Sequence, residues 1–64
     1  MTTVIETDVP IGKIKSFGKY GPQYEIIREI RRDVDKTIIE IRMVATGEEA
    51  EYELSKAMAD PDAL

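Results

Sequence analysis

Five glutamates in the carboxyl-terminal half of the chain have a spacing that could form an acidic binding surface. Glu49, Glu51 and Glu53 occupy alternate positions, and Glu40 and Glu48 lie close to them in the sequence. On an extended strand, alternate residues point to the same face about 7 Å apart. The pattern predicts a row of carboxylates able to occupy a basic groove on a partner protein. The alternative is an ordinary solvated face that keeps a small protein soluble.

Catalysis is restricted by what the composition lacks. Histidine and cysteine are both absent, which removes the imidazole base, the thiolate nucleophile and the soft metal ligands. Two carboxylates can still divide acid and base roles, but such a pair needs a pocket. A chain of 64 residues forms a thin core with little room for one. We therefore expect no enzyme activity, no cofactor and no metal.

A second candidate surface lies in the amino-terminal half. Lys13, Lys15 and Lys19 are interleaved with Phe17 and Tyr20, and a β-surface of such residues can hold phosphates and stack bases. This pattern makes a nucleic-acid-binding module the alternative function. The competing interpretation places Phe17 in the core and leaves the lysines solvated on an edge strand. The net charge of −4 favours that second interpretation, because it opposes binding to polyanions.

The charges are also divided along the chain. Residues 11–32 carry an excess of lysine and arginine, whereas residues 33–64 carry an excess of aspartate and glutamate. This division predicts an electric dipole, with an acidic hairpin at one end and a basic half at the other.

The clearest turn signal is the run from Gly18 to Pro22. Its two glycines permit positive φ, and Pro22 lacks a backbone donor. Tyr20 lies between these glycines, so it is either an exposed anchor for a protein interface or a cover for the core.

Two strands joined in a hairpin are predicted to position the carboxylates. Residues 37–44 and 49–54 both alternate apolar with charged side chains, as expected of strands in a hairpin closed around residues 45–48. The pattern predicts a register with Ile41 opposite Tyr52 and Arg42 opposite Glu51. The latter pair would stabilise the hairpin by about 0.2–1 kcal/mol. A shift by one residue would turn the apolar set outward.

The remaining elements follow from the same reasoning. Residues 11–17 alternate as a short, half-exposed strand. Residues 24–32 fit a helix as well as a strand, and β-branched residues favour the strand, which would end at a turn over 33–36. Ser55 is placed to cap a helix over 56–59 that ends at Asp60-Pro61. Met58 and Leu64 would then fold back over an open end of the sheet.

Together these elements predict a mainly β fold. We expect one domain over residues 1–64, with residues 1–10 either loose or at a sheet edge. Its architecture would be an antiparallel four-stranded meander with a short C-terminal helix, and a strongly curled version would be a small SH3-like barrel.

The sequence also resembles a family of small bacterial proteins of about this length that has no assigned activity. The resemblance spans most of the chain and rests on turns, strand alternation and a helix cap. The matching segments are Val9-Pro10-Ile11-Gly12, Phe17-Gly18, Tyr20-Gly21-Pro22, Tyr24-Glu25, Thr46-Gly47-Glu48, Glu51-Tyr52, Leu54-Ser55 and Asp60-Pro61. It implies a bacterial, cytoplasmic, β-rich protein and carries over no chemistry.

These observations favour a non-catalytic, protein-binding regulator or inhibitor, such as an antitoxin or an anti-defence protein. Its expected interface is the carboxylate row (Glu40, Glu49, Glu51 and Glu53) together with Tyr20. No signal peptide or apolar membrane span is present in the sequence, so we expect a cytoplasmic protein. A homodimer is a further way to bury surface in so small a domain.

Overall fold

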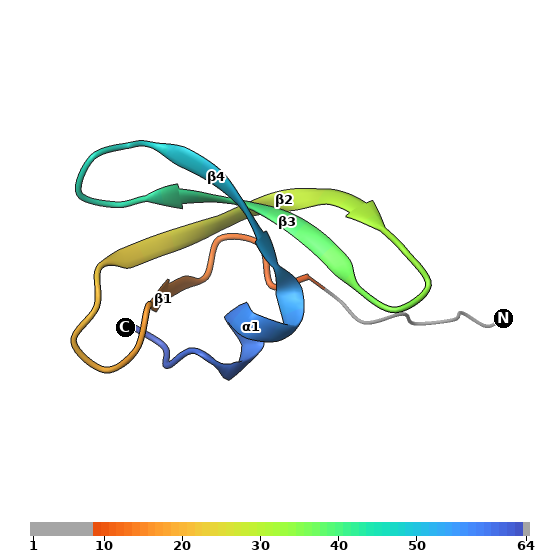
Figure 1. Ribbon diagram of the computed structural model, residues 1–64. Coiled ribbons are helices and arrows are strands. Elements are labelled where there is room, and N and C mark those ends of the chain that lie inside the picture. Colours follow the sequence, from red (N-terminus) through yellow and green to blue (C-terminus); the bar gives the residue numbers. More distant parts are fainter. Residues whose placement is uncertain (1–8, 64) are drawn as a thin grey trace, which may run out of the picture.

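The computed structural model describes residues 9–63. Its strands are β1 (Ile14–Ser16), β2 (Gln23–Arg32), β3 (Thr37–Met43) and β4 (Glu49–Glu53), and the helix α1 (Leu54–Ala59) follows directly. The strands form one antiparallel sheet in the order β1-β2-β3-β4 (Figure 1). The prediction of a mainly β meander with a short C-terminal helix is therefore confirmed. The sheet is open, with β1 and β4 as its edges. Residues 1–8, predicted to be loose or at an edge, lie outside the described residues, as does Leu64.

β1 is shorter than the predicted strand over 11–17. Gly12 has a φ of 89°, and the Ile11 N–H donates to the Val9 carbonyl at 2.8 Å. The chain therefore turns at this point, and Ile11 is left 64% exposed. The regular strand therefore begins only at Ile14, although the Gly12 N–H already donates to the Ile26 carbonyl of β2 at 2.7 Å.

The ambiguous segment 24–32 is a strand, as preferred, and its ambiguity has a physical source. The register between β2 and β3 shifts twice, once between Ile26 and Arg28 and once between Glu29 and Arg31. Each shift inserts one extra residue, which bends the strand and changes which face the following residues occupy. Even spacing predicted Ile30 on the same face as Ile26. In the structure Glu29 lies opposite the buried Ile39 instead.

The β3–β4 hairpin forms with the predicted faces, but the predicted register was wrong by two residues. Arg42 lies opposite Glu49, not Glu51, and Ile41 lies opposite Ala50, not Tyr52. The connection is longer than expected because the Val44 N–H donates to the Gln23 carbonyl of β2 at 3.0 Å. Val44 therefore belongs to the pairing with β2 and cannot also open the ladder with β4. A shift by two residues keeps every side chain on its face.

Helix α1 begins earlier than predicted. Glu53, not Ser55, occupies the N-cap position, and it makes no side-chain capping bond. The Ser55 hydroxyl donates instead to the Glu53 carboxylate at 3.0 Å. The end of the helix is as expected, since Asp60 is the C-cap. Among the described residues, no helix has the length and apolar character needed to cross a membrane.

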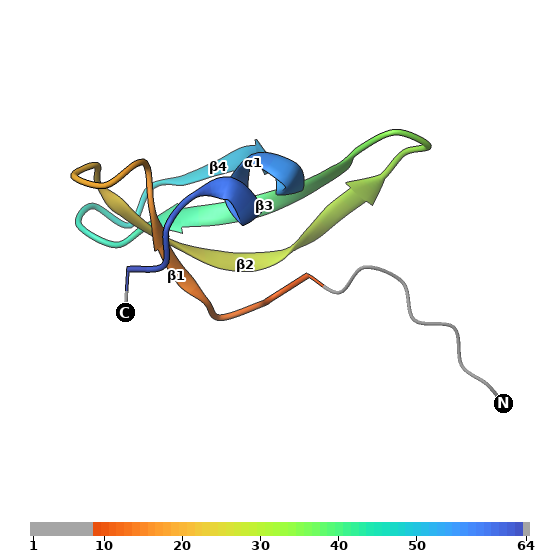
Figure 2. The same ribbon diagram turned by 90° about the horizontal axis from the view of Figure 1, so that it is seen from below.

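The core lies between one face of the sheet and α1, which contacts β3 and β4 (Figure 2). α1 contributes Leu54 and Ala57 to it, while Met58 is 55% exposed and does not fold back over the sheet as predicted. Partly buried apolar side chains, among them Phe17 and Tyr52, surround the core. The buried residues of this core are Tyr24, Ile26, Ile39, Ile41, Leu54 and Ala57.

Two glycines in the β1–β2 loop allow the packing of that loop to be tested by substitution. A Cβ on Gly21 would lie 1.7 Å from the Phe17 carbonyl oxygen, whereas a Cβ on Gly18 would meet nothing within 4 Å. Gly18 has a φ of 73°, so Gly18→Ala should cost about 1–2 kcal/mol through backbone strain alone. Gly21→Ala should lower the free energy of unfolding by more than this matched control in urea denaturation. An equal loss in both variants would show that the loop is looser than described.

Candidate protein-binding surface

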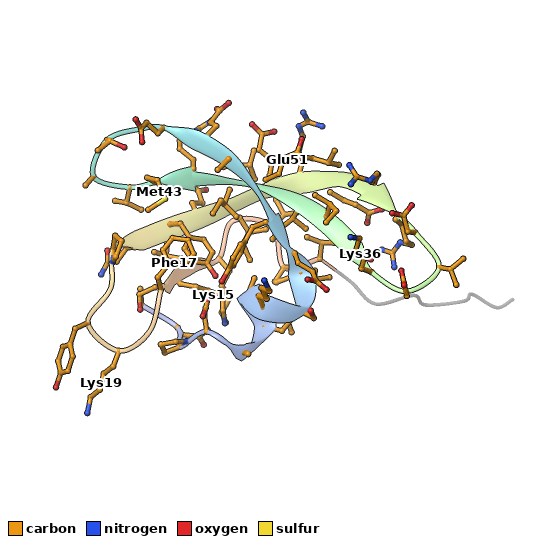
Figure 3. All side chains as sticks on the ribbon, in the orientation of Figure 1. Lys15, Phe17, Lys19, Lys36, Met43 and Glu51 are labelled. Atoms are coloured by element: carbon orange, nitrogen blue, oxygen red, sulfur yellow. The ribbon has the colours of Figure 1, made fainter. Side chains whose placement is uncertain are left out.

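The predicted carboxylates lie together on the β3–β4 hairpin. We call the surface formed by Glu40, Glu48, Glu49, Glu51 and Glu53 the acidic hairpin surface. Figure 3 shows Glu51 on the side of the sheet away from Lys15, Phe17 and α1. The core face and the face of Glu40, Glu49 and Glu51 are thus opposite faces of the same hairpin, as strand alternation requires. Glu48 bonds to Met43, which packs against the core, so Glu48 joins the acidic hairpin surface from the end of the hairpin and not from this face.

Two arginines neutralise part of this surface. The Arg28 Nε lies 2.7 Å from the Glu40 carboxylate, and an Arg42 guanidinium nitrogen lies 3.2 Å from the Glu49 carboxylate. Arg28 reaches Glu40 because the first register shift in β2 places these residues opposite each other. The pairing of Arg28 was not foreseen from the sequence, since it depends on the shift.

An open hollow of about 200 Å³ lies on this face, lined by Arg28, Ile30, Glu40, Glu49, Ala50 and Glu51. Hydrogen bonding with the Glu40 carboxyl, and then with the Arg42 guanidinium, lowers the pKa of Glu49. A general acid needs a carboxyl group whose pKa is raised toward the working pH. The shift at Glu49 has the opposite direction, so this carboxyl is not poised to act as a general acid.

Other members of the surface keep their charge exposed. Glu48 and Glu51 are exposed, and within residues 9–63 the ion pairs do not include either of them. Glu53 is half-buried and accepts the Ser55 hydroxyl. Glu48 and Glu51 are therefore the carboxylates with the most to gain from a cation on another molecule.

The structure does not place Tyr20 with these carboxylates. Tyr20 is 90% exposed, and the Lys19 ammonium lies 5.5 Å from the centre of its ring. In Figure 3, Lys19 projects at the lower left, whereas Glu51 lies above the sheet at the top centre. Tyr20 is thus a separate exposed feature and does not cover the core.

The residues of the nucleic-acid alternative are not gathered into one surface. Lys15, expected to be exposed, is 6% exposed because its ammonium lies 2.8 Å from the Asp62 carboxylate. Lys13 lies 3.2 Å from the same carboxylate. Phe17 stacks against Tyr24, with 4.6 Å between ring centres.

Basic and acidic segments also meet elsewhere, which reduces the predicted dipole. Arg31 lies 3.6 Å from Asp33, and Lys13 and Lys15 lie 3.2 and 2.8 Å from Asp62. The sequence division into a basic and an acidic half does not survive folding, because β2 packs directly against the acidic β3 and β4 hairpin and its arginines reach across.

One cluster that positions the hairpin was missed from the sequence. The hydroxyls of Tyr24 and Tyr52 both donate to Asp60 Oδ2, at 2.7 and 3.0 Å. Phe17 and Tyr52 meet edge to face, with ring centres 5.2 Å apart. From the sequence, Asp60 is expected only to end the helix, and no acceptor is assigned to either tyrosine hydroxyl. The available signal was the need of a buried tyrosine hydroxyl for an acceptor.

The cluster changes the ionisation of its members. Burial, the hydrogen bond to Asp60 and the negative charge of that residue raise the pKa of Tyr24 above its ordinary value of 10.0. The same causes raise the pKa of Tyr52. Hydrogen bonds from Lys15 and Lys13 lower the pKa of Asp62.

The fold and surface define a small mainly β protein whose open antiparallel sheet carries an acidic hairpin. Residues 2–64 match the family of unknown function DUF5397. An uncharacterised protein of Haemophilus influenzae is 33% identical over 61 residues, covering 92% of this chain and 95% of the relative. The chain belongs to the DUF5397 family. The predicted resemblance to a small family without an assigned activity is thereby confirmed.

The tyrosine cluster yields a prediction for alkaline pH. Tyr24 stays protonated in the fold while the unfolded chain ionises near pH 10, so stability is complete below pH 10 and is lost as pH rises above it. Tyr24→Phe should cost about 1.5–3 kcal/mol at neutral pH, because it removes a hydrogen bond to a charged group. Its free energy of unfolding should then fall less steeply above pH 10 than that of the wild type.

Urea denaturation over a pH series measures both effects. Tyr20→Phe is the matched control, since Tyr20 is 90% exposed and its replacement should change the free energy of unfolding little at neutral pH. A Tyr24→Phe variant as stable as this control at neutral pH would contradict the role given to the bond with Asp60.

Proposed function

We propose that this chain is a non-catalytic, cytoplasmic regulator or inhibitor that binds another protein through its acidic hairpin surface. An antitoxin or an anti-defence protein is the kind of function that this implies. The observation that supports the proposal best is the exposure of Glu48 and Glu51, whose carboxylates form no ion pair within residues 9–63. Such charges steer association with a basic partner and select against acidic ones.

The neighbouring ion pairs support the same proposal. Arg42 and Arg28 pair with Glu49 and Glu40, so within residues 9–63 the carboxylates left for a partner on this surface are chiefly those of Glu48 and Glu51. Nucleic-acid binding receives no comparable support, because Lys13 and Lys15 already share the Asp62 carboxylate.

Charge reversal at the exposed carboxylates tests the proposal. Glu48→Lys/Glu51→Lys should reduce capture of the partner at least about tenfold, which corresponds to a loss of 1.4 kcal/mol. The matched control is Asp33→Lys/Asp35→Lys at the β2–β3 turn, which changes the net charge equally and should leave capture intact. The tagged proteins are used to capture partners from host lysate with and without nuclease, and bound proteins are quantified by mass spectrometry.

The outcomes separate the two functions considered. Equal capture by the two double variants would contradict binding through the acidic hairpin surface. Loss of the captured material on nuclease treatment would move the function to nucleic-acid binding. Circular dichroism of each variant verifies that the fold is retained, as expected for exposed substitutions.

A further inference from the structure

Within residues 9–63, another segment of the chain lies along the β1 edge of the sheet but not along the β4 edge. The outer edge of β1 is occupied by the segment after α1: the Ser16 N–H donates to the Pro61 carbonyl at 3.0 Å, and the Ala63 N–H donates to the Ile14 carbonyl at 2.9 Å. Between these bonds, Lys15 and Asp62 face each other and form an ion pair at 2.8 Å. The edge is thus closed by an antiparallel extended segment whose register is fixed by one charge pair.

The other edge, on β4, carries no further strand within residues 9–63. The Met43 N–H donates to the Glu48 carbonyl at 2.7 Å, and the register places Ile41 opposite Ala50. Since bonded and non-bonded pairs alternate along an antiparallel ladder, Ala50 and Tyr52 bond to β3. The backbone N–H and C=O groups of Glu49 and Glu51 therefore point outward, away from the sheet.

The outward groups are free to bond with another chain. Within residues 9–63, the backbone hydrogen bonds outside the regular ladders do not involve the amides of Glu49 or Glu51. An edge of this kind can receive an added strand. The side chains of the same two residues are carboxylates, and Glu51 forms no ion pair in the described part of the chain.

The negative charges of Glu49 and Glu51 determine which kind of strand can pair with the β4 edge. Pairing of two copies of this chain through β4 would bring like carboxylates against one another, which is destabilising. A strand with lysine or arginine opposite Glu49 and Glu51 would instead form cross-strand ion pairs, as Lys15 and Asp62 do at the β1 edge with the charges exchanged. A basic partner is therefore favoured over a second copy.

We propose that the β4 edge binds an extended basic segment of a partner protein, which adds to the sheet as an antiparallel fifth strand next to β4. Lysine or arginine residues lie opposite Glu49 and Glu51, and apolar residues alternate with them on the face of Ala50. This inference rests on the proposed function and specifies its partner. Affinity comes from the backbone bonds at the edge, and selectivity comes from the carboxylates.

A short peptide in which lysine and valine alternate is the probe, followed by amide chemical shifts at low ionic strength. In the proposed register the backbone groups of the lysines face β4, and those of the valines face solvent. N-methylation of the lysine amides should therefore weaken binding at least about tenfold. The same modification on the valine amides is the matched control and should have little effect. The shifts on binding should be largest at Glu49 and Glu51.

A second variant separates backbone bonding from side-chain charge. Proline is tolerated on an edge strand where its missing N–H would face solvent, so Glu51→Pro should fold and lose peptide binding at least about tenfold. Glu51→Gln removes the same charge but keeps the N–H, and it should retain most of the binding. Equal binding of both N-methylated peptides, or shifts elsewhere than β4, would overturn the added strand.

The partner capture distinguishes this inference from the proposed function. If Glu48→Lys/Glu51→Lys loses the partner while Glu51→Pro keeps it, the partner meets the carboxylates without joining the sheet, and only the added strand is wrong. If neither variant loses the partner, the proposed function is wrong as well.

Discussion

The bond of Asp60 to two tyrosine hydroxyls is the constraint on which the rest of the structure depends. Tyr24 comes from β2 and Tyr52 from β4, so a single carboxylate oxygen ties together two strands that flank β3. Asp60 is also the C-cap of α1. One residue therefore fixes where the helix ends, which face of the sheet it covers and how the two strands approach. A short chain without disulfides needs such a long-range connection, because its core alone supplies little stability.

The same connection determines which edge of the sheet remains open. Because α1 ends at Asp60, the next residues run beside β1 and place Asp62 against Lys15 and Lys13. After α1 the chain runs along β1, away from β4. None of the segments within residues 9–63 lies along the outer edge of β4. One edge is thus closed by the protein's own residues, and the other presents Glu49 and Glu51. The proposed interface follows from this asymmetry of the fold as much as from the charges.

Patterns that depend on neighbouring residues could be predicted from the sequence, whereas features that depend on distant ones could not. Alternation placed Ile39 and Ile41 in the core and gathered the acidic residues on the opposite face. The hairpin register was missed because Val44 bonds to β2, which no local pattern records. Lys15 was expected at the surface because its partner is separated from it by 47 positions. The carboxylates of the candidate surface were identified, but their position beside an open edge required the topology.

Backbone hydrogen exchange tests the central claim that one edge is closed and the other open. In a monomeric sample, the amides of Ala50, Tyr52 and Ser16 should exchange slowly, since each is bonded to a neighbouring segment. The amides of Glu49 and Glu51 should exchange at rates close to those of an unstructured peptide. Slow exchange at Glu49 and Glu51, equal to that of their neighbours in β4, would contradict the account, because it would mean that this edge is already covered.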